Sequence, residues 1–548
     1  MIDISFISAI LLLINIVLVS LFDLRYTLNS NKISKFKINK NWKIKEETFV
    51  PIFFPVKNEP IDLIIKKIEY IKNNYKNYEN IIINFVFIDD TDPRKELDLI
   101  KYLENIKTNK YKEVVDENTT FYIYESFPII YIFRIGGVKR KGAALDDAVK
   151  YFYKKSKIKY FGVYDFEWTV NLEYIEKAVK ILENTDYSFV YWNRRTIGVD
   201  TVHRAIGIYV DTFFEIVLPS KQYLENISMV HGSCGIIKVE DFLKVGGFTP
   251  HITEDANLTV RFYINGYKGL YIKDWIEYGQ NLPPNINMTI KTLRRWQIGT
   301  ADVINKNIFK ILRSKNLNFI QKISLIQMFT NLYSVLFISF TLLLSAILSI
   351  FIDFSFEFYS KYSWFFYFSI IYIISVLLFE YYTTAKRIYK KPRILEVILS
   401  LLFAWGLSSL TMIYYIRTLI FGNYNQWIVT KKKKESYYLD IYGITVVPIF
   451  LFITLFLFVY NTYWIIENIL VYKLLSLEYI IIYLKVIMIG LLPLEIWVLS
   501  LTIILILQLV HMRKSYSEDI KDLLYVGIMD NPNNSVGMVN KNLIKISK

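Results

Sequence analysis

Six stretches of the chain are almost free of charged residues, and they limit the possible fold more than any other feature. Most are long enough to cross a hydrocarbon core of about 30 Å. Soluble core helices are rarely so long and so apolar on every face. The sequence therefore predicts an integral membrane protein with about five to seven crossings. The stretches are residues 5–22, 326–350, 364–384, 395–420, 442–462 and 477–510.

The charges beside the first stretch predict its orientation. Asp3 precedes this stretch without any Lys or Arg, whereas Arg25, Lys32 and Lys35 follow it. A secretion signal has the reverse arrangement, so the stretch is expected to remain as an anchor. Because basic flanks stay on the cytosolic side of a membrane, residues 23–325 are predicted to lie in the cytosol.

The net charge of +15 raises the question of nucleic-acid binding. The chain contains no recognition-helix or RNA-binding motif, so no nucleic-acid partner is expected. The basic clusters at residues 386–393 and 431–434 adjoin hydrophobic stretches. Topology and contact with anionic membrane lipid explain these clusters more simply. The single cysteine, Cys234, excludes an intramolecular disulfide and a cysteine-based zinc cluster.

Residues 46–285 have the pattern of one α/β domain. A continuous apolar run at residues 81–88 ends in Asp89 and Asp90, as expected of a buried parallel strand with carboxylates at its end. Further apolar runs alternate with helical patterns, which predicts a doubly wound, mostly parallel sheet. Ligands of such sheets bind where the strands end. The expected strands are residues 131–135 and 160–164, and the expected helices are residues 142–153 and 172–184.

Charged residues at the first strand end and at a helix start are candidates for nucleotide and phosphate binding. Asp89 or Asp90 could accept hydrogen bonds from a base or ribose, although carboxylates at such places also cap helices and form Asx turns. Arg134 and Lys141 place cations near the free amides of a helix start, where a diphosphate could bind. A solvated basic loop before an ordinary helix is the alternative.

A second group of acids could hold a metal and move a proton. Asp165 and Glu167 are two residues apart in extended chain, so both face one side and could chelate Mg²⁺ or Mn²⁺. Chance pairs of this kind are common, and the position after a strand end is what distinguishes this one. Asp255, beside Glu254, is the candidate general base, because a partly dry cleft raises a carboxylate pKa. An N-cap for a helix through residues 258–263 is an equally physical role.

Arg295 and Trp296 lie in an amphipathic stretch at residues 285–319. An indole face can stack on a sugar ring while a guanidinium binds phosphate. Arg and Trp are also common anchors at a membrane interface, which is the alternative role. The stretch itself is predicted to lie at the membrane surface beneath the α/β domain.

Taken in order, these motifs resemble the membrane-integral family-2 glycosyltransferases, the group of cellulose synthase, hyaluronan synthase and related β-glycan synthases. The resemblance covers about residues 46–435. Its later members are Gly232–Cys234, a Gly-Gly-Phe segment, Thr-Glu-Asp at residues 253–255, and Arg295-Trp296. Residues 427–432, Trp-Ile-Val-Thr-Lys-Lys, look like the gating-loop motif F-x-V-T-x-K of that group, with Trp in place of Phe.

The resemblance implies a role for each candidate. A nucleotide-sugar donor, with a UDP-sugar as the first choice, would contact Asp89, Asp90, Arg134, Lys141 and Asp165, and also Thr430 and Lys432 when the loop closes. Asp165 and Glu167 would hold Mg²⁺ or Mn²⁺, and Asp255 would deprotonate the acceptor. Glu254, Arg295, Trp296 and Cys234 would line the acceptor and diphosphate site. Such enzymes invert the anomeric centre in one direct displacement.

The expected function is the building of a polysaccharide at the cytosolic face of the cell membrane. Two departures from the family pattern leave alternatives open, since Glu167 replaces Asp and Thr292 replaces the Gln of Q-x-x-R-W. One alternative is a single transfer to a lipid-linked acceptor. The other is a degenerate transferase that serves as a scaffold.

The predicted organisation of the multi-pass chain follows from these motifs. Three apolar stretches separate the catalytic domain from the gating-like loop. If each crossed the membrane, this odd number of crossings would place the loop outside the cell. Residues 395–420 could instead be re-entrant or lie in the interface. The regions are a transmembrane anchor (1–25), a cytosolic glycosyltransferase domain (46–285), interfacial amphipathic helices (286–320), transmembrane or re-entrant helices (326–420), a basic gating-like loop (421–440), C-terminal transmembrane helices (441–510) and a polar cytosolic tail (511–548).

Overall fold

The computed structural model describes most of the first 422 residues. The described ranges are residues 4–32, 38–39, 41–198, 200–279, 286–331, 356–389 and 391–422, with single positions at 463, 500 and 503. The predicted gating-like loop, C-terminal transmembrane helices and tail therefore lie almost wholly outside the described residues, as do Thr430 and Lys432.

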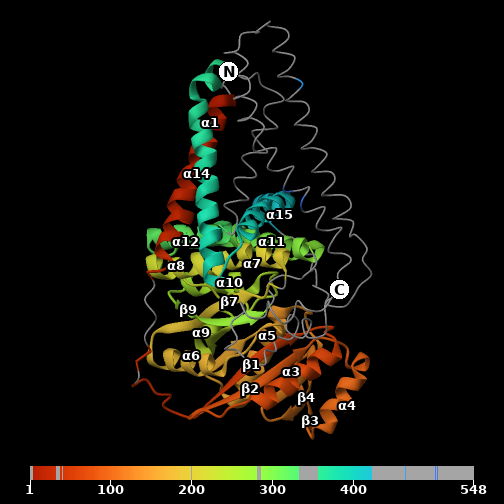
Figure 1. Ribbon diagram of the computed structural model, residues 1–548. Helices are drawn as coiled ribbons and strands as arrows, with labels where there is room; N and C mark the ends of the chain where they lie inside the picture. Colours follow the sequence, from red (N-terminus) through yellow and green to blue (C-terminus); the bar gives the residue numbers. More distant parts are fainter. Residues whose placement is uncertain are drawn as a thin grey trace, which may run out of the picture.

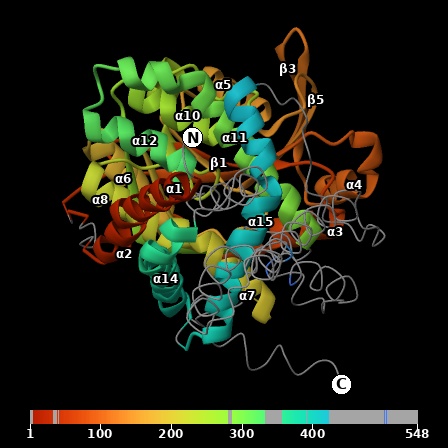
Figure 2. The same cartoon turned by 90° about the horizontal axis from the view of Figure 1, so that it is seen from above.

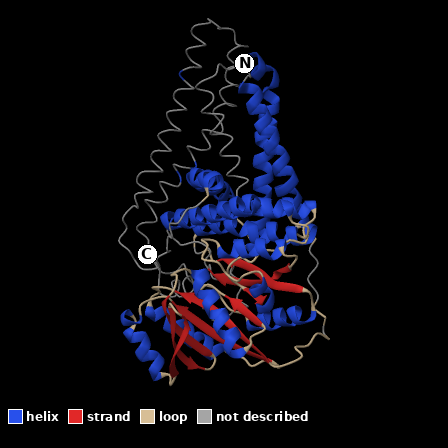
Figure 3. Cartoon of the chain, turned by 180° about the vertical axis from the view of Figure 1, so that it is seen from behind, coloured by secondary structure: helices blue, strands red, loops and turns tan. Residues whose placement is uncertain are grey.

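A nine-stranded sheet with helices on both faces forms the α/β domain, and Figure 3 shows this sheet at the end of the molecule opposite the long helices. The strand order is β3-β4-β5-β2-β1-β6-β8-β7-β9. The strands are β1 (Thr48–Val56), β2 (Ile81–Asp89), β3 (Asn109–Asp116), β4 (Thr119–Ser126), β5 (Ile129–Gly136), β6 (Tyr160–Val163), β7 (Tyr187–Thr196), β8 (Gly235–Lys238) and β9 (Lys268–Gly279).

The strand pairings confirm the α/β class and add antiparallel strands that the sequence did not predict. The centre of the sheet, β5-β2-β1-β6, is parallel, and so is the pair β7-β9. The hairpin β3-β4-β5 and the strand β8 between β6 and β7 are antiparallel. The sheet is therefore mixed. The sequence predicted β5 but missed β3, β4 and β8, because β3 is mostly exposed and β8 is only four residues long, so neither gives a clear apolar run.

Alternating side chains of the strands build two hydrophobic cores. In β1, Ile52 and Phe54 point to the core beneath α3 (Ile61–Asn74), α4 (Leu97–Asn105) and α6 (Leu172–Asn184). Phe53 points to the opposite core, as the two-residue period of a strand requires. The second core packs against α5 (Lys141–Ser156), α7 (Thr201–Thr212), α9 (Val239–Lys244), α10 (Glu254–Ile264) and α11 (Ile286–Arg313).

A layer of helices separates the sheet from two protruding helices (Figure 1). The layer contains α7, α8 (Leu218–Glu225), α11 and α12 (Phe319–Asn331). Its outer apolar residues Phe309, Leu312, Phe319, Ile320 and Ile323 are each at least 41% exposed. An exposed apolar band of this kind suits a membrane surface.

The protruding helices α1 (Ile4–Leu18) and α14 (Phe356–Ile388) run side by side away from the domain (Figure 1). The Ser20 and Tyr372 hydroxyls form a hydrogen bond between the two segments. Among the described residues, Ala9–Asn29 and Tyr367–Ile388 are long and apolar enough to cross a membrane. These two segments correspond to the predicted stretches at residues 5–22 and 364–384.

Helix α15 (Ile394–Phe421) is fastened to the catalytic domain at both ends. Near its start, Glu396 lies 3.0 Å from Arg204 of α7, and the Ser400 hydroxyl donates to the Ala205 carbonyl at 2.9 Å. Near its end, the Asn305 amide of α11 donates to the Leu419 carbonyl at 2.7 Å. Figure 2 shows α15 crossing over the domain, whereas α14 is seen nearly end-on.

The pair between Glu396 and Arg204 is buried, so its loss should destabilise the protein. The Glu396→Ala variant leaves the guanidinium without its carboxylate, at a cost of about 3–5 kcal/mol. Thermal unfolding of the detergent-purified protein measures this change. The matched control is Glu104→Ala, because Glu104 forms an exposed pair with Lys110 at 3.2 Å, which contributes less than about 1 kcal/mol. Equal melting temperatures for the two variants would contradict the buried attachment of α15.

Candidate active site

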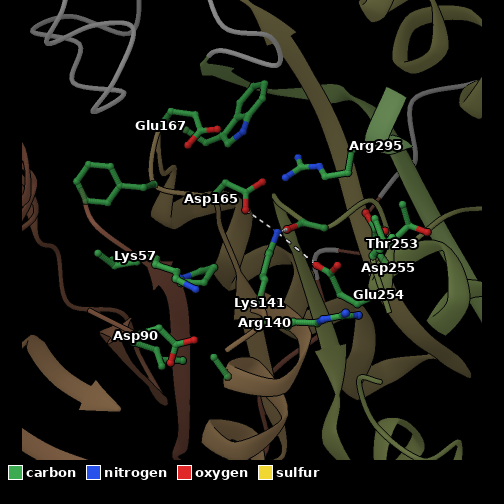
Figure 4. Close-up of a pocket in the computed structure, with 18 of the residues that line it drawn as sticks. Lys57, Asp90, Arg140, Lys141, Asp165, Glu167, Thr253, Glu254, Asp255 and Arg295 are labelled. Atoms are coloured by element: carbon green, nitrogen blue, oxygen red, sulfur yellow. Dashed lines mark hydrogen bonds and ion pairs between the residues drawn. The ribbon is translucent and has the colours of Figure 1, made fainter. Parts of the chain in front are cut away.

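A cavity of about 250 Å³ opens at the edge of the sheet where the parallel strands β1, β2 and β6 end. Figure 4 shows Asp90 and Lys57 on one side of this cavity, Glu254 and Asp255 on the other, and Lys141 with Asp165 between them. The acids predicted from separate segments therefore meet in one place. The charged lining residues are Lys57, Glu59, Asp90, Lys139, Arg140, Lys141, Asp165, Glu167, Arg194, Glu254, Asp255 and Arg295.

Lys141 joins three segments at the centre of the cavity. It is the first residue of α5, and its ammonium donates to Asp165 at 2.5 Å and to the Gly232 carbonyl at 2.9 Å. The Glu254 carboxylate lies 3.6 Å away. Burial alone would lower the pKa of Lys141, but Asp165 and Glu254 outweigh burial and raise this pKa above its ordinary value. The ammonium is therefore a permanent cation among the acids.

The two acids at the start of α10 resist ionisation. Burial raises the pKa of Glu254 to about 7, with Lys141 opposing and Asp255 adding to the rise. Burial also raises the pKa of Asp255, while Lys141, the Ala256 amide and then Arg194 oppose the rise. This agrees with the expected behaviour of a carboxylate in a partly dry cleft. Asp255 lies inside the first turn of α10, and Thr253 is at the cap position.

Gly232 lets the chain pass close to Asp255. Its φ of +76° favours glycine, and a Cβ there would lie 2.8 Å from an Asp255 carboxylate oxygen and 3.4 Å from the Lys141 ammonium. The segment before β8 therefore forms the wall behind the candidate base. Cys234, two residues further on, is fully buried in the core beneath α3 and α6 and is not part of the cavity lining. Burial raises the pKa of the Cys234 thiol well above its ordinary value.

The strand-end pair Asp89 and Asp90 divides between core and cavity. Asp90 lines the cavity, whereas Asp89 is fully buried and accepts hydrogen bonds from the Tyr131 hydroxyl at 2.6 Å and the Thr91 amide at 2.7 Å. Arg134 is also buried outside the cavity lining. Its guanidinium holds Asp90 at 2.8 Å and Asp147 at 2.6 Å, which orients the Asp90 carboxylate toward the cavity edge.

Asp165 and Glu167 both line the cavity just after β6. No group of three His, Cys, Asp or Glu residues forms a ready metal site among the described residues. The two carboxylates still fit a magnesium ion, because Mg²⁺ in nucleotide enzymes is commonly bound by one or two carboxylates together with substrate phosphates. The close approach of the Lys141 ammonium to Asp165 shows that a positive charge is favoured at this carboxylate.

Helix α11 closes the cavity opposite the sheet edge. Arg295 and Trp296 both line the cavity. Gly299, one turn further along, lies under Thr253, since a Cβ there would come within 2.3 Å of the Thr253 side chain. His251 also connects the Thr253–Asp255 segment to α11, because its ring lies 2.5 Å from Asp302. Burial works against ionisation, but hydrogen bonds from His251 and Lys306 lower the pKa of Asp302 to about 2.

The cavity also contains charged and aromatic residues that the sequence did not single out. Lys57, Arg140, Arg194 and His231 are examples. Lys57 directly follows β1. It could have been predicted in the same way as Asp90 and Asp165, because ligands of parallel sheets bind where the strands end. Arg194 lies within β7 and His231 precedes β8, where no strand end marks them.

Comparison with known proteins gives one family match and several similar enzymes. Residues 169–383 match the family model described as Glycosyl transferase family group 2. Glucomannan 4-beta-mannosyltransferase 9 of Arabidopsis thaliana is 23% identical over 235 residues, which are 42% of this chain and 44% of that protein. Probable glucomannan 4-beta-mannosyltransferase 11 of Oryza sativa subsp. japonica is 23% identical over 189 residues, covering 34% of this chain and 33% of that protein.

A solved structure is similar at a lower level. The mannosyltransferase PcManGT from Pyrobaculum calidifontis, in complex with GDP-Man and Mn²⁺, is 12% identical with a TM-score of 0.44. The similarity covers 69% of this chain and 98% of that chain. The family model and these relatives confirm the resemblance predicted from the motifs, since residues 169–383 are similar to the family-2 glycosyltransferases. The match spans less than half the length of the curated relatives.

The raised pKa of Glu254 predicts a pH-dependent stability. The ordinary value is 4.5 and the folded value about 7, so the unfolded chain loses this proton first as the pH rises. The unaltered protein therefore loses up to about 3 kcal/mol of stability from this group between pH 4.5 and 7. The side chain introduced by Glu254→Gln stays neutral at every pH. The stability of this variant minus that of the unaltered protein should therefore be larger at pH 8 than at pH 5.

Thermal unfolding at the two pH values tests this expectation. Glu104→Gln is the control, because Glu104 is exposed and its replacement should leave the difference between the two pH values unchanged. A Glu254→Gln variant that follows the unaltered protein at both pH values would show that Glu254 ionises normally in the folded state.

Proposed function

We propose that this chain transfers a sugar from a nucleotide-sugar donor to a glycan acceptor with inversion of the anomeric centre. The observation that supports the proposal is the convergence of Asp90, Asp165, Glu167 and Asp255 around the Lys141 ammonium in one cavity. Acids from three segments, the ends of β2 and β6 and the start of α10, lie here beside a partly buried cation, which suits the binding of a diphosphate beside a proton acceptor.

Asp255 is the proposed general base. Burial raises the pKa of Asp255 above that of an exposed aspartate and thus closer to pH 7. A higher pKa makes the carboxylate a stronger proton acceptor. Asp255 would take the proton from the attacking acceptor hydroxyl while that oxygen displaces the nucleoside diphosphate. One base and one displacement give inversion, and the mechanism requires no carboxylate nucleophile.

The remaining residues would hold the donor. Asp90, oriented by Arg134, would accept hydrogen bonds from the nucleotide, and Lys141 at the start of α5 would face the diphosphate together with the free amides of the helix. Arg295 and Trp296 would position the diphosphate and the acceptor sugar. A Mg²⁺ or Mn²⁺ ion bound by Asp165 and Glu167 would neutralise the charge of the departing diphosphate.

We propose a polysaccharide as the product, because the curated relatives are named as glucomannan mannosyltransferases. The donor would be a UDP- or GDP-linked hexose. A single transfer to a lipid-linked acceptor is the second candidate, motivated by Thr292 in place of the family's Gln. Thr292 is buried in α11, one helical turn before Trp296. The acceptor end of the cavity therefore lacks the side-chain amide that the family's Gln would provide.

The proposed location is the cytosolic face of a membrane. Helices α1 and α14 would cross the bilayer, and the apolar residues of α11 and α12 would lie in its surface. Both ends of α15 contact the catalytic domain, so we propose that residues 394–421 lie along the interface and do not cross. The end of α15 at Phe421 would then lie on the same side of the membrane as the cavity.

The purified protein, incubated in detergent with labelled UDP- and GDP-hexoses and Mg²⁺ or Mn²⁺, tests the proposed function. A long polymer is the expected product, and a lipid carrying one sugar would support the second candidate. The absence of both transfer and donor hydrolysis with every donor would favour the scaffold hypothesis.

The Asp255→Asn variant tests the role of the base. An amide cannot accept the hydroxyl proton, so turnover should fall by at least about 100-fold. Donor binding, followed by thermal shift, should persist because the phosphate-binding cations are intact. Asp98→Asn is the matched control, since Asp98 is exposed on α4 and pairs weakly with Lys101 at 3.4 Å. Turnover by Asp255→Asn near that of the control would exclude Asp255 as the base.

A further inference from the structure

Arg194 is a buried cation that faces the cavity. It lies in β7 and is 8% exposed, and it contributes to the cavity lining. Its guanidinium carbon lies 5.3 Å from the ring centre of Trp168 and 4.5 Å from that of Phe214. Cation–π contacts with these two rings therefore hold the guanidinium in place, and neither ring supplies a carboxylate for its N–H groups.

No carboxylate of the described part of the chain pairs with Arg194. Its neighbour Arg195 forms an ion pair with Glu215 at 2.6 Å, and Arg134 is held by Asp90 and Asp147. No side-chain hydrogen bond or ion pair joins Arg194 to another described residue, and its Nε is buried without an acceptor. Asp255 interacts with its charge only without direct contact. A buried charge without a hydrogen-bonded counterion is costly. A ligand anion in the cavity would remove that cost.

The strand order places Arg194 on the acceptor side of the cavity. Asp90 follows β2, Asp165 follows β6, Gly232 precedes β8 and Arg194 lies in the next strand, β7. Adjacent strands are about 4.8 Å apart, so Arg194 and Asp90 are separated by roughly 15–20 Å along the sheet edge. The nucleotide is proposed at Asp90, and the base Asp255 adjoins Gly232. An anion at Arg194 would therefore belong to the acceptor.

The other polar groups near Arg194 do not replace such an anion. Glu254 lies 3.6 Å from Lys141, and the charge of Lys141 acts on Asp255 more strongly than the charge of Arg194 does. The His231 ring packs between Tyr191 and Phe214. Burial, followed by the charge of Arg194, lowers the pKa of His231 well below its ordinary value, so this ring stays neutral. Among the described residues, Arg194 is thus the cation of β7 that lines the cavity.

We propose that Arg194 binds an anionic oxygen group, a carboxylate or a phosphate, on the acceptor. The substrate class follows: the enzyme extends an acidic glycan or a phosphate-bearing lipid in preference to a neutral acceptor. This inference rests on the proposed glycosyltransferase function and specifies its acceptor. A planar guanidinium fixed by two rings suits a bidentate contact with either group.

Two matched pairs of acceptors distinguish the sources of the anion. One pair is a uronic-acid oligosaccharide and its neutral glucose counterpart, and the other is a polyprenyl phosphate and the free polyprenol. The unaltered protein should prefer the anionic member of one pair by about tenfold or more in kcat/KM, as a charge-assisted hydrogen bond provides. The preferred pair identifies whether the anion is a carboxylate or a phosphate.

Variants of Arg194 show whether this residue causes the preference. Arg194→Met keeps an apolar side chain between the rings and should reduce the preference to less than about twofold. Arg194→Lys restores the charge without the planar fork and should give an intermediate preference. Arg140→Met, which removes another cavity arginine, is the control and should retain the full preference whatever its total rate. Melting temperatures establish that each variant folds.

The inference fails if the unaltered protein uses neutral and anionic acceptors equally, or if Arg194→Met keeps the preference. It also fails if Arg194→Met raises the KM for the donor and leaves the preference intact, because the guanidinium would then serve the donor diphosphate. Donor hydrolysis without any transfer to the four acceptors would likewise overturn it. The absence of donor turnover in the unaltered protein would instead count against the proposed function itself.

Discussion

The contact of the Lys141 ammonium with Asp165, Glu254 and the Gly232 carbonyl holds the edge of the cavity together. It connects the start of α5 with the end of β6, the segment before β8 and the start of α10. Acids brought this close would repel one another without a cation. A metal ion that bound Asp165 could replace the Lys141 ammonium as its partner, and the ammonium could then contact the diphosphate. The site would therefore be formed before the ligand binds.

The strand-end acids were predictable because parallel strands end at a shared edge, which brings Asp90 and Asp165 together whatever the loops do. The sequence could not tell which of Asp89 and Asp90 faces the cavity, since that depends on how far β2 extends before it ends. Arg134 was named from a motif, and its contact with Asp147 emerges only when α5 packs beside β5. Arg194 was missed because Trp168 and Phe214, which hold it, come from distant segments.

The apolar stretches of the sequence located the helices α14 and α15 but did not predict their orientation relative to the α/β domain. Both the α14 and α15 segments are apolar, yet α14 protrudes beside α1 while α15 packs along α7 and α11. Glu396, Ser400 and Asn305 add polar contacts at the ends of α15 with residues far away in the chain. The same α11 also supplies Arg295 and Trp296 to the cavity, so the helix proposed to lie at the membrane surface also lines the proposed site.

A cryo-EM structure of the unaltered protein with Mg²⁺ and whichever of UDP or GDP stabilises it tests the central claim most directly. The account predicts a cation about 2.1 Å from carboxylate oxygens of both Asp165 and Glu167, with the diphosphate beside Lys141 and Asp255 across the same cavity. A nucleotide bound elsewhere, or Asp90, Asp165 and Asp255 pointing into separate regions of the protein, would contradict it.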